Sequence, residues 1–367
     1  MIMKKILFLT NIPSPYRVDF FNELGKYVEL TVVFEKRKSD ERDESWNKKA
    51  FENFHAVFLD GIKITVNKAF CPSVKRVIKK NCFDLIICSN YATPTGVLAV
   101  DYMIRHNIPY AIEGDGAILK KCSLVKKIIK KRTVKNAIAL FSTSKSLDEY
   151  FRFFGAEPEK IFRYHFSSMK QEDILGTPIS YDNKMNIRKK LEINEQHIVV
   201  TVGQFIYRKG FDILLKAAKS FDVTYGFYFI GGKPTEEYKE LVSNLKLNNV
   251  HFVGFKEKED LKDYFCAADV FAFPTREDIW GLVVNEAMGY GLPIVSTKRC
   301  IAATEMINNE CGYIINIDSV EELVESINKL FSHDLYQAGC SSIQVANEYT
   351  IEKMCEDHLK IIDDIIT

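Results

Sequence analysis

Short apolar runs alternate with longer amphipathic segments along most of this 367-residue chain, and this alternation constrains the fold more than any other feature. Apolar runs bounded by turn residues are typical of buried strands, whereas the longer segments between them have the spacing of amphipathic helices. A repeated strand–helix–strand order places the strands side by side in a parallel sheet, with helices on both faces. The sequence therefore predicts an α/β fold.

The predicted strands form two series, separated by a segment that has neither period. The first series comprises residues 5–10, 30–34, 84–89, 109–113 and 137–143. The second series comprises residues 197–203, 225–231, 250–254, 269–274, 293–297 and 312–315. The residues between the series, 167–185, include Gly176 and Pro178, so we expect the domain linker there. Two domains, at residues 1–170 and 185–349, also agree with the length of the chain.

Two doubly wound, Rossmann-like domains that face a central cleft are the arrangement we expect from these series. In a doubly wound sheet, ligands bind outside the carboxyl ends of the strands. The loops that follow the predicted strands are therefore the segments in which to look for functional residues.

The distribution of charge differs between the two halves of the chain. The whole chain holds 50 Lys and Arg residues against 49 Asp and Glu, which gives no indication of a nucleic-acid partner. Residues 1–170, however, hold 30 basic and 18 acidic side chains, while residues 171–367 hold 20 and 31. This asymmetry indicates that the first half meets an anionic partner or surface.

Cysteine usage and hydropathy bear on the cellular compartment. The nine cysteines include no C-x-x-C pair, so neither a disulfide framework nor a cysteine zinc site is expected. The apolar run at the amino end stops at Thr10, which is too short for a secretory signal, and no apolar stretch has the length of a membrane span. We therefore expect a cytoplasmic protein with reduced thiols, at most peripheral at the inner face of the membrane.

The segment from Pro274 to Thr297 carries the strongest functional signal. A predicted strand ends at Pro274, a loop carries Asp278, and a helix that carries Glu286 begins near Gly281. Free N–H groups and the helix dipole at such a helix start favour a phosphate, and nearby carboxylates accept hydrogen bonds from sugar hydroxyls. The alternative is that Asp278 only caps the helix and that Glu286 lies on a solvated face.

The segment from Val202 to Ala218 has a similar order: a strand, a loop with adjacent Arg208 and Lys209, then Gly210 and a helix. The planar guanidinium and the compact ammonium can neutralise a diphosphate from two directions. The alternative is that both side chains belong to the solvated surface.

Taken together, these two segments resemble the retaining glycosyltransferases of family 4, which have the GT-B fold. The matching residues of the first segment are Val202, Gly203, Lys209, Gly210 and Ala217. Those of the second segment are Asp278, Gly281, Leu282, Glu286, Ala287, Met288, Gly291 and Pro293. The resemblance covers the whole second domain closely and the first domain only in organisation.

The resemblance implies a role for each matching position. Arg208 and Lys209 match residues that hold the donor diphosphate and stabilise the charge of the leaving group. Glu286 matches the acid that holds the nucleotide ribose, and Asp278 replaces the acid, usually Glu, that contacts the transferred sugar. Further donor contacts are implied at Gly203, Gly254, Phe255, Trp280, Gly281 and Leu282.

The first domain departs from the family pattern where an acceptor would bind. Many members have a Gly-Gly turn after the first strand, where residues 11–17 of this chain form a rigid N-I-P-S-P-Y-R sequence. We expect Tyr16 and Arg17 to contact the acceptor, with a surface position as the alternative for Arg17. Many members also have a His near the place of Asp115, which follows Glu113 in an E-G-D-G sequence. A carboxylate there can orient the acceptor hydroxyl or can serve an Asp-Gly turn.

The function implied is the transfer of a sugar from a nucleotide diphosphate donor to an acceptor hydroxyl, with retained anomeric configuration. The acceptor expected is a glycan or a lipid-linked or cell-surface polysaccharide precursor. No D-x-D sequence is present, and the resemblance implies neither a metal nor a cofactor. Two other classes stay open: a nucleotide-sugar epimerase of GT-B fold and a non-enzymatic, two-lobed sugar-binding protein. An oxidoreductase is disfavoured because no G-x-G-x-x-G follows a predicted strand.

Two further expectations concern surfaces of the first domain. Basic side chains crowd into one segment, namely Lys120, Lys121, Lys126, Lys127, Lys130, Lys131, Arg132 and Lys135, around the apolar Leu124, Val125, Ile128 and Ile129. A helix there fits an anionic membrane, unless its apolar side packs on its own domain. The apolar residues after Tyr349 allow an amphipathic helix over 350–367, which the resemblance implies returns to the first domain.

Overall fold

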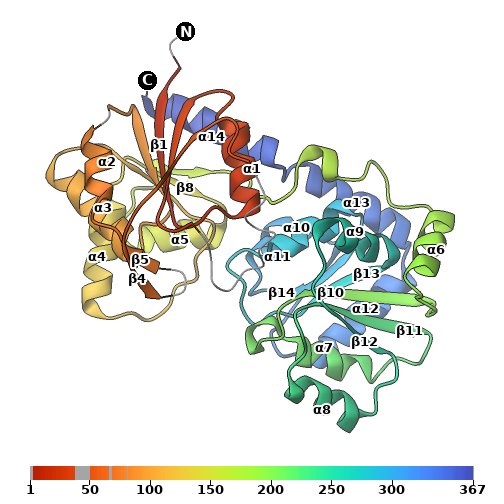
Figure 1. The fold of residues 1–367 in the computed structure, drawn as a ribbon. Helices are drawn as coiled ribbons and strands as arrows, with labels where there is room; N and C mark the ends of the chain where they lie inside the picture. Colours follow the sequence, from red (N-terminus) through yellow and green to blue (C-terminus); the bar gives the residue numbers. More distant parts are fainter. Residues whose placement is uncertain (1–2, 38–49, 66–67, 81, 367) are drawn as a thin grey trace. The chain divides into compact units, whose positions relative to one another are not determined.

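The computed structural model describes residues 3–37, 50–65, 68–80 and 82–366. The chain divides into two compact units, which we call the first and the second unit (Figure 1). The first unit consists of Met1–Ser167 together with Ile351–Thr367, and the second unit consists of Ser168–Thr350. The chain therefore leaves the first unit once and returns to it after Thr350.

The first unit is built on a parallel sheet with helices on both faces (Figure 1). Its described strands lie in the order β3-β2-β1-β6-β7-β8-β9. They are β1 (Lys5–Thr10), β2 (Glu29–Phe34), β3 (His55–Phe58), β6 (Leu85–Cys88), β7 (Ala111–Glu113), β8 (Ala139–Ser142) and β9 (Ile161–Arg163). The helices are α1 (Pro15–Leu24), α2 (Val74–Lys80), α3 (Pro94–Arg105), α4 (Leu124–Lys135), α5 (Lys145–Phe153), η2 (Pro158–Lys160) and α14 (Ile351–Ile366). A separate antiparallel hairpin consists of β4 (Ile62–Thr65) and β5 (Lys68–Phe70).

The second unit repeats this architecture with the strand order β12-β11-β10-β13-β14-β15. The strands, all parallel, are β10 (His197–Gly203), β11 (Tyr225–Gly231), β12 (Val250–Val253), β13 (Val270–Phe273), β14 (Ile294–Thr297) and β15 (Gly312–Ile315). The helices are η3 (Gln171–Asp173), α6 (Tyr181–Lys190), η4 (Tyr207–Lys209), α7 (Phe211–Ala218), α8 (Glu236–Leu245), α9 (Lys258–Ala267), α10 (Leu282–Gly289), α11 (Ile301–Met306), α12 (Val320–Ser332) and α13 (Leu335–Asn347).

These observations confirm the predicted α/β fold with two Rossmann-like sheets. All eleven predicted strands are present, because central parallel strands are buried on both faces and read as continuous apolar runs. Every residue of β6 and of β13, for example, is buried. The structure adds β3 and β9 at the two edges of the first sheet and the β4–β5 hairpin, none of which the sequence pattern predicts.

Each sheet reverses its strand order at one place, which determines where ligands bind. The reversal lies between β1 and β6 in the first unit and between β10 and β13 in the second. The loops that leave two such strands turn to opposite faces of the sheet, and the crevice between them is the usual ligand site of a doubly wound domain. We call these two places the switch points.

Helix α14 packs against α1 in the first unit, although it follows the whole second unit in the chain (Figure 1). Ile351, Met354 and Ile362 lie on its buried face. Their spacing of three, four and eight residues is that of one stripe along an amphipathic helix.

Candidate functional site

The loops that leave β10 and β13 are joined to each other at the switch point of the second unit. The Arg276 amide and the Thr275 hydroxyl both donate to the carbonyl oxygen of Arg208, each at 2.8 Å. Gly210 has a φ of 69°, and a Cβ atom there would lie 2.0 Å from the carbonyl oxygen of Pro274. This position therefore requires glycine, and the loop around Arg208 is held against the end of β13.

Two cations converge on one carboxylate at this switch point. The ammonium of Lys209 lies 2.5 Å from Oδ2 of Asp278, with side chains that are only 14% and 15% exposed. The guanidinium of Arg208 lies 3.4 Å from the same oxygen and also donates to the carbonyl oxygen of Glu277 at 2.7 Å. The Arg208 side chain is exposed, so the three groups together present a net positive charge to an incoming anion.

The amino end of α10 lies beside these groups and has no side-chain cap. Its N-cap residue, Gly281, has a φ of 102°, and a Cβ atom there would lie 2.6 Å from the sulfur of Cys300. The loop before it is fixed because the buried Trp280 indole donates to Asn285 at 2.8 Å. Leu282 is the first residue of the helix, so the N–H groups of its first turn are not capped by a side chain and suit an anion.

Glu286 extends from α10 and accepts a hydrogen bond of 3.0 Å from the hydroxyl of Ser168. Burial raises the pKa of Glu286, and the Ser168 hydrogen bond offsets this rise only in part. Sequence reasoning missed Ser168, because nothing in its neighbourhood marks a serine that lies 118 residues before its partner.

The remaining predicted donor contacts lie at the same edge of the second sheet. Gly203 is the last residue of β10, and Gly254 and the exposed Phe255 directly follow β12. No heavy atom lies within 4 Å of the place that a Cβ atom of Gly254 would occupy. The structure thus brings every predicted residue of the donor site to the carboxyl edge of one sheet.

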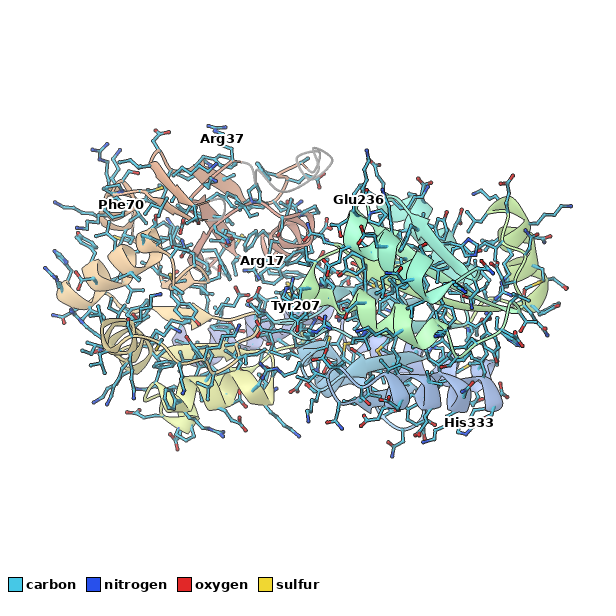
Figure 2. All side chains as sticks on the ribbon, turned by 90° about the horizontal axis from the view of Figure 1, so that it is seen from below. Arg17, Arg37, Phe70, Tyr207, Glu236 and His333 are labelled. Carbon is cyan, nitrogen blue, oxygen red and sulfur yellow. The ribbon has the colours of Figure 1, made fainter. Side chains whose placement is uncertain are left out.

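Arg276 holds this edge together and was not predicted from the sequence. Its guanidinium donates twice to Asp212 at 2.7 and 2.8 Å and once to Asp318 at 2.6 Å. It also stacks 3.9 Å from the ring centre of Tyr207, an exposed residue labelled in Figure 2. Arg276 therefore ties the loop after β10 to α7 and to the loop after β15.

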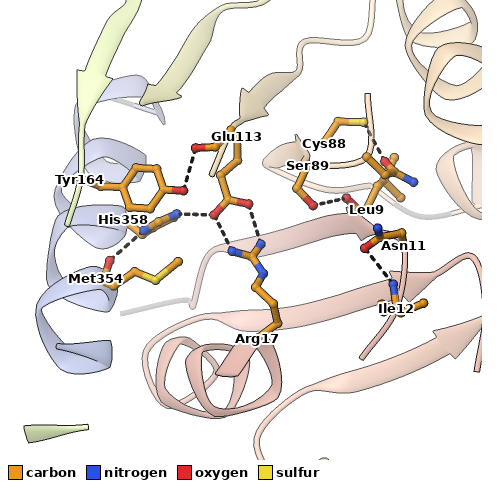
Figure 3. Close-up of polar contacts among 12 residues, drawn as sticks. Leu9, Asn11, Ile12, Arg17, Cys88, Ser89, Glu113, Tyr164, Met354 and His358 are labelled. Carbon is orange, nitrogen blue, oxygen red and sulfur yellow. Dashed lines mark hydrogen bonds and ion pairs between the residues drawn. The ribbon is translucent and has the colours of Figure 1, made fainter. Parts of the chain in front are cut away.

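In the first unit, Arg17 and Glu113, which the sequence predicts as acceptor contacts, form a buried ion pair with each other (Figure 3). The guanidinium of Arg17 donates to both carboxylate oxygens of Glu113, at 2.8 and 2.5 Å. Both side chains are almost fully buried, so neither presents its charge to solvent. We correct their assignment: they connect α1 to the carboxyl end of β7.

His358 of α14 completes this cluster, which we call the Arg17–Glu113–His358 cluster (Figure 3). One ring nitrogen faces the carbonyl oxygen of Met354 at 2.7 Å, and the other faces Glu113 at 3.2 Å. Both partners are oxygen atoms that accept hydrogen bonds, so the ring connects the backbone of α14 to the carboxylate of Glu113. The cluster therefore joins α1, the end of β7 and α14 through one carboxylate.

Aromatic rings surround the Arg17–Glu113–His358 cluster. The rings around His358 have centres between 4.6 and 6.4 Å from its own and belong to Phe8, Phe20, Phe141 and Tyr164. Burial by itself raises the pKa of Glu113, but Arg17 and His358 more than offset this effect and lower the pKa to about 2. The carboxylate is thus ionised at neutral pH.

Asp115 and Tyr16 are the predicted acceptor residues that do not belong to this cluster. Asp115 lies just beyond the carboxyl end of β7 and is exposed to solvent. The carbonyl oxygen of Gly114, the preceding residue, accepts a 2.9 Å hydrogen bond from Tyr164. Tyr16 is partly buried, with its ring edge-to-face against Phe166 at 5.7 Å.

Comparison with known proteins bears on the second unit in particular. Residues 183–342 match the family model described as "Glycosyl transferases group 1". The chain is 27% identical over 170 residues to the "uncharacterized 41.2 kDa protein in cps region" of Klebsiella pneumoniae, which covers 44% of this chain and 46% of that protein. It is 25% identical over 205 residues to the lipopolysaccharide glucosyltransferase WaaG of Escherichia coli K12, covering 53% of each. The chain thus spans about half the length of these curated relatives.

A solved structure extends the likeness in fold to nearly the whole chain. Anabaena Alr3699/HepE, solved in complex with UDP, matches with a TM-score of 0.81 and 17% identity, covering 98% of this chain and all of that one. The family match contains each predicted donor residue from Gly203 to Glu286. Residues 183–342 therefore match the glycosyl transferases group 1 family model, within a chain that has the GT-B fold.

Proposed function

We propose that this protein is a retaining glycosyltransferase that moves a sugar from a nucleotide diphosphate donor to an acceptor hydroxyl. The observation that carries the proposal is the convergence of Arg208 and Lys209 on Asp278, beside the uncapped amino end of α10. Cations and free N–H groups aimed at one place form a site for a diphosphate. The family match of this domain and the UDP bound to the Anabaena protein of the same fold support the proposal.

Different residues of this site bind different parts of the nucleotide sugar donor. The diphosphate lies at the amino end of α10, where it replaces Asp278 as the partner of Lys209 and is also reached by Arg208. The freed carboxylate of Asp278 accepts hydrogen bonds from hydroxyls of the transferred sugar, and Glu286 does so from the ribose. Asp278 thus neutralises Lys209 when no donor is present and contacts the sugar when it is.

Stabilisation of the leaving diphosphate is the main catalytic effect that we propose. As the bond from the anomeric carbon to the phosphate oxygen breaks, the sugar gains oxocarbenium character and the diphosphate gains negative charge. Arg208, Lys209 and the α10 dipole stabilise that charge. The acceptor hydroxyl attacks from the side on which the diphosphate leaves, and its proton passes to a phosphate oxygen, so configuration is retained. With the cations in these positions, we propose that transfer needs no metal ion.

The acceptor that we propose is a lipid-linked or cell-surface polysaccharide precursor, bound by the first unit. The relatives named for lipopolysaccharide and for a cps region support this class. Asp115 is the group that meets the acceptor hydroxyl, because this exposed residue lies just beyond the end of β7, where burial of the carboxyl group raises its pKa. Arg17 and Glu113 are positioning residues. Their ion pair holds the carboxyl end of β7, and Asp115 lies just after that end.

Nucleotide sugars are expected to stabilise the protein and to identify the donor. A ligand present at a hundred times its Kd adds about 2.7 kcal/mol to the free energy of unfolding. We would measure the melting temperature with UDP, GDP and ADP sugars, using Lys209→Ala as the deficient variant and the exposed Lys239→Ala as the control. Transfer in the presence of EDTA, with nucleotide release that depends strictly on an added acceptor, would support the proposal. Release without acceptor would favour the epimerase.

Helix α4 supports a further part of the proposal, namely contact with an anionic membrane at its inner face. None of the described helices is long and apolar enough to cross a bilayer. Leu124, Val125 and Ile128 of α4, however, are 79%, 66% and 66% exposed. These three side chains do not pack on their own domain, although Val134 of the same helix does. We propose that they enter the interfacial region while neighbouring lysines meet headgroups.

Replacing Lys126, Lys127, Lys130 and Lys131 with Gln is expected to weaken binding to anionic vesicles. Each basic residue near an anionic surface contributes about 1 kcal/mol, which salt reduces. Sedimentation with anionic and with neutral vesicles measures the effect. A charge-matched control removes the same number of cations from the second unit, at the exposed Lys219, Lys233, Lys239 and Lys246. Equal binding of the parent to both vesicle types would contradict the membrane proposal.

A further inference from the structure

We infer that Ser168 is a positioning residue that orients the carboxylate of Glu286 toward the ribose of the nucleotide. The inference rests on the proposed function, because it takes Glu286 as the acid that binds the ribose. It adds a residue from the segment by which the chain enters the second unit. This segment precedes residues 183–342, which match the family model and contain every predicted donor residue.

The protein holds one oxygen of the Glu286 carboxylate and leaves the other accessible. The hydroxyl of Ser168 donates to Oε1 at 3.0 Å. Among the described residues, no other group donates to this carboxylate, and Oε2 is not one of the buried atoms that lack a partner. An ionised carboxylate can accept several hydrogen bonds. With Oε1 fixed by Ser168, Oε2 is the atom that can accept from a ribose hydroxyl.

A glycine allows the segment that carries Ser168 to lie directly against α10. A Cβ atom at Gly289 would lie 2.6 Å from the sulfur of Met169, and the Leu175 amide donates to the Gly289 carbonyl oxygen at 3.0 Å. Residues three apart in a helix lie on the same side, so Gly289 and Glu286 face the same segment. The contact of Met169 with Gly289 therefore places Ser168, the preceding residue, beside Glu286.

The same segment is also tied to a neighbouring helix, so Ser168 has little freedom to move away. Met169 is buried, and the η3 turn that follows it carries Asp173. The carboxylate of Asp173 pairs at 2.5 Å with the ammonium of Lys258, the first residue of α9. The segment is thus held against α10 at Met169 and against α9 at Asp173.

The Ser168 hydrogen bond also favours the charged form of Glu286, which is the form that accepts from a hydroxyl. Burial raises the pKa of Glu286, and the charge of Asp173 adds to this rise. The Ser168 hydrogen bond and the charge of Lys258 act in the opposite direction. Ser168 therefore fixes the direction of the carboxylate and helps to keep it ionised.

The expected consequence is that the protein distinguishes nucleotides with ribose hydroxyls from those without them. Losing a hydrogen bond to an ionised group costs about tenfold or more in affinity. A carboxylate that is already oriented loses less freedom when the ribose binds, so more of the hydrogen bond appears as affinity. Without Ser168, the carboxylate is free to rotate and this advantage is reduced.

Paired nucleotides test the inference. Titration calorimetry compares UDP, GDP and ADP with their 2′,3′-dideoxy forms, and the pair that contains the tightest ligand is used for the variants. The parent is expected to prefer the ribonucleotide by at least about tenfold, and Ser168→Ala is expected to reduce this ratio to about threefold. Ser168→Cys, with a weaker donor, should also lower the ratio, whereas Ser168→Thr keeps the hydroxyl and should retain it. Ser243→Ala, at an exposed serine of α8, is the control.

The outcomes separate the inference from the proposed function. If Glu286→Ala abolishes the preference for the ribonucleotide but Ser168→Ala and Ser168→Cys keep it, the inference is overturned while the ribose role of Glu286 stands. If the parent has no such preference, or Glu286→Ala retains it, that part of the proposed function fails and the inference fails with it. If Ser168→Ala weakens both nucleotides by the same factor, Ser168 only supports the structure of the site and the inference is overturned. Melting temperatures without nucleotide show whether each variant is folded.

Discussion

Lys209→Ala lowers kcat/KM for sugar transfer by at least about a hundredfold, which corresponds to roughly 2.7 kcal/mol of transition-state stabilisation. The substitution removes the cation closest to Asp278 and leaves that carboxylate near the place where the leaving diphosphate gains charge. Both effects raise the energy of the transition state more than that of the bound donor. Steady-state kinetics with saturating acceptor measure the change, and Lys239→Ala is the control because its side chain is exposed on α8.

Glu286→Ala is expected to cause a loss of the same size, through a different contact. Removing the carboxylate abolishes the hydrogen bonds to the nucleotide ribose and leaves the Ser168 hydroxyl without its partner. Glu286→Gln keeps the shape and one acceptor, so its loss should be smaller. Near-normal turnover of Lys209→Ala and Glu286→Ala together, with unchanged melting temperatures, would mean that the donor site lies elsewhere.

Glu113→Gln lowers the free energy of unfolding of the first unit by about 3 kcal/mol, because it leaves the buried guanidinium of Arg17 without a counter-charge. Arg17 donates to this carboxylate, and Nε2 of His358 lies 3.2 Å from it, inside a shell of aromatic rings. Denaturant titration, followed by fluorescence and by circular dichroism, measures the change. Replacing the whole cluster, with Arg17→Met, Glu113→Leu and His358→Phe, should recover much of the stability because no buried charge remains.

The effect of Glu113→Gln depends on pH in a defined direction. The pKa of Glu113 is lowered to about 2 in the folded protein, compared with about 4.3 in an unfolded chain. Its stabilising contribution is therefore complete above about pH 4.3 and is lost as the pH falls toward about 2. The difference between the parent and Glu113→Gln should stay constant from neutral pH to about pH 5 and shrink at about pH 3. A difference that grows on acidification would contradict the ion pair.

The strands that are easiest to predict from the sequence are those with a continuous apolar run. A central parallel strand, such as β1 or β10, is apolar throughout and lies between turn residues. The edge strand β3 is only half buried, and β9 is only three residues long, so neither leaves a clear apolar run. Incomplete burial therefore weakens the sequence signal, although the half-buried edge strand β12 was still predicted.

The need for a local sequence pattern also explains which site residues could be predicted. Arg208, Lys209 and Glu286 lie in short segments whose order of strand, glycine and helix is visible in the sequence. Arg17 and Glu113, in contrast, are 96 residues apart, and no local pattern indicates that two charged side chains will meet in the interior. The sequence therefore predicted that each contacts the acceptor and did not reveal that they pair with each other.

The return of α14 to the first unit has a consequence for how the protein folds as it is synthesised. The ribosome releases the strands of the first unit first, but the helix that covers α1 and supplies His358 comes after the whole second unit. Residues 168–350, in contrast, are contiguous and can fold as soon as they emerge. We therefore expect the second unit to complete its folding first. Arg17 and Glu113 then lack their contact with His358 until α14 has been synthesised. The docking of α14 onto α1 is then the last step of folding, and a chain interrupted before residue 358 would leave aromatic side chains such as Phe20 uncovered.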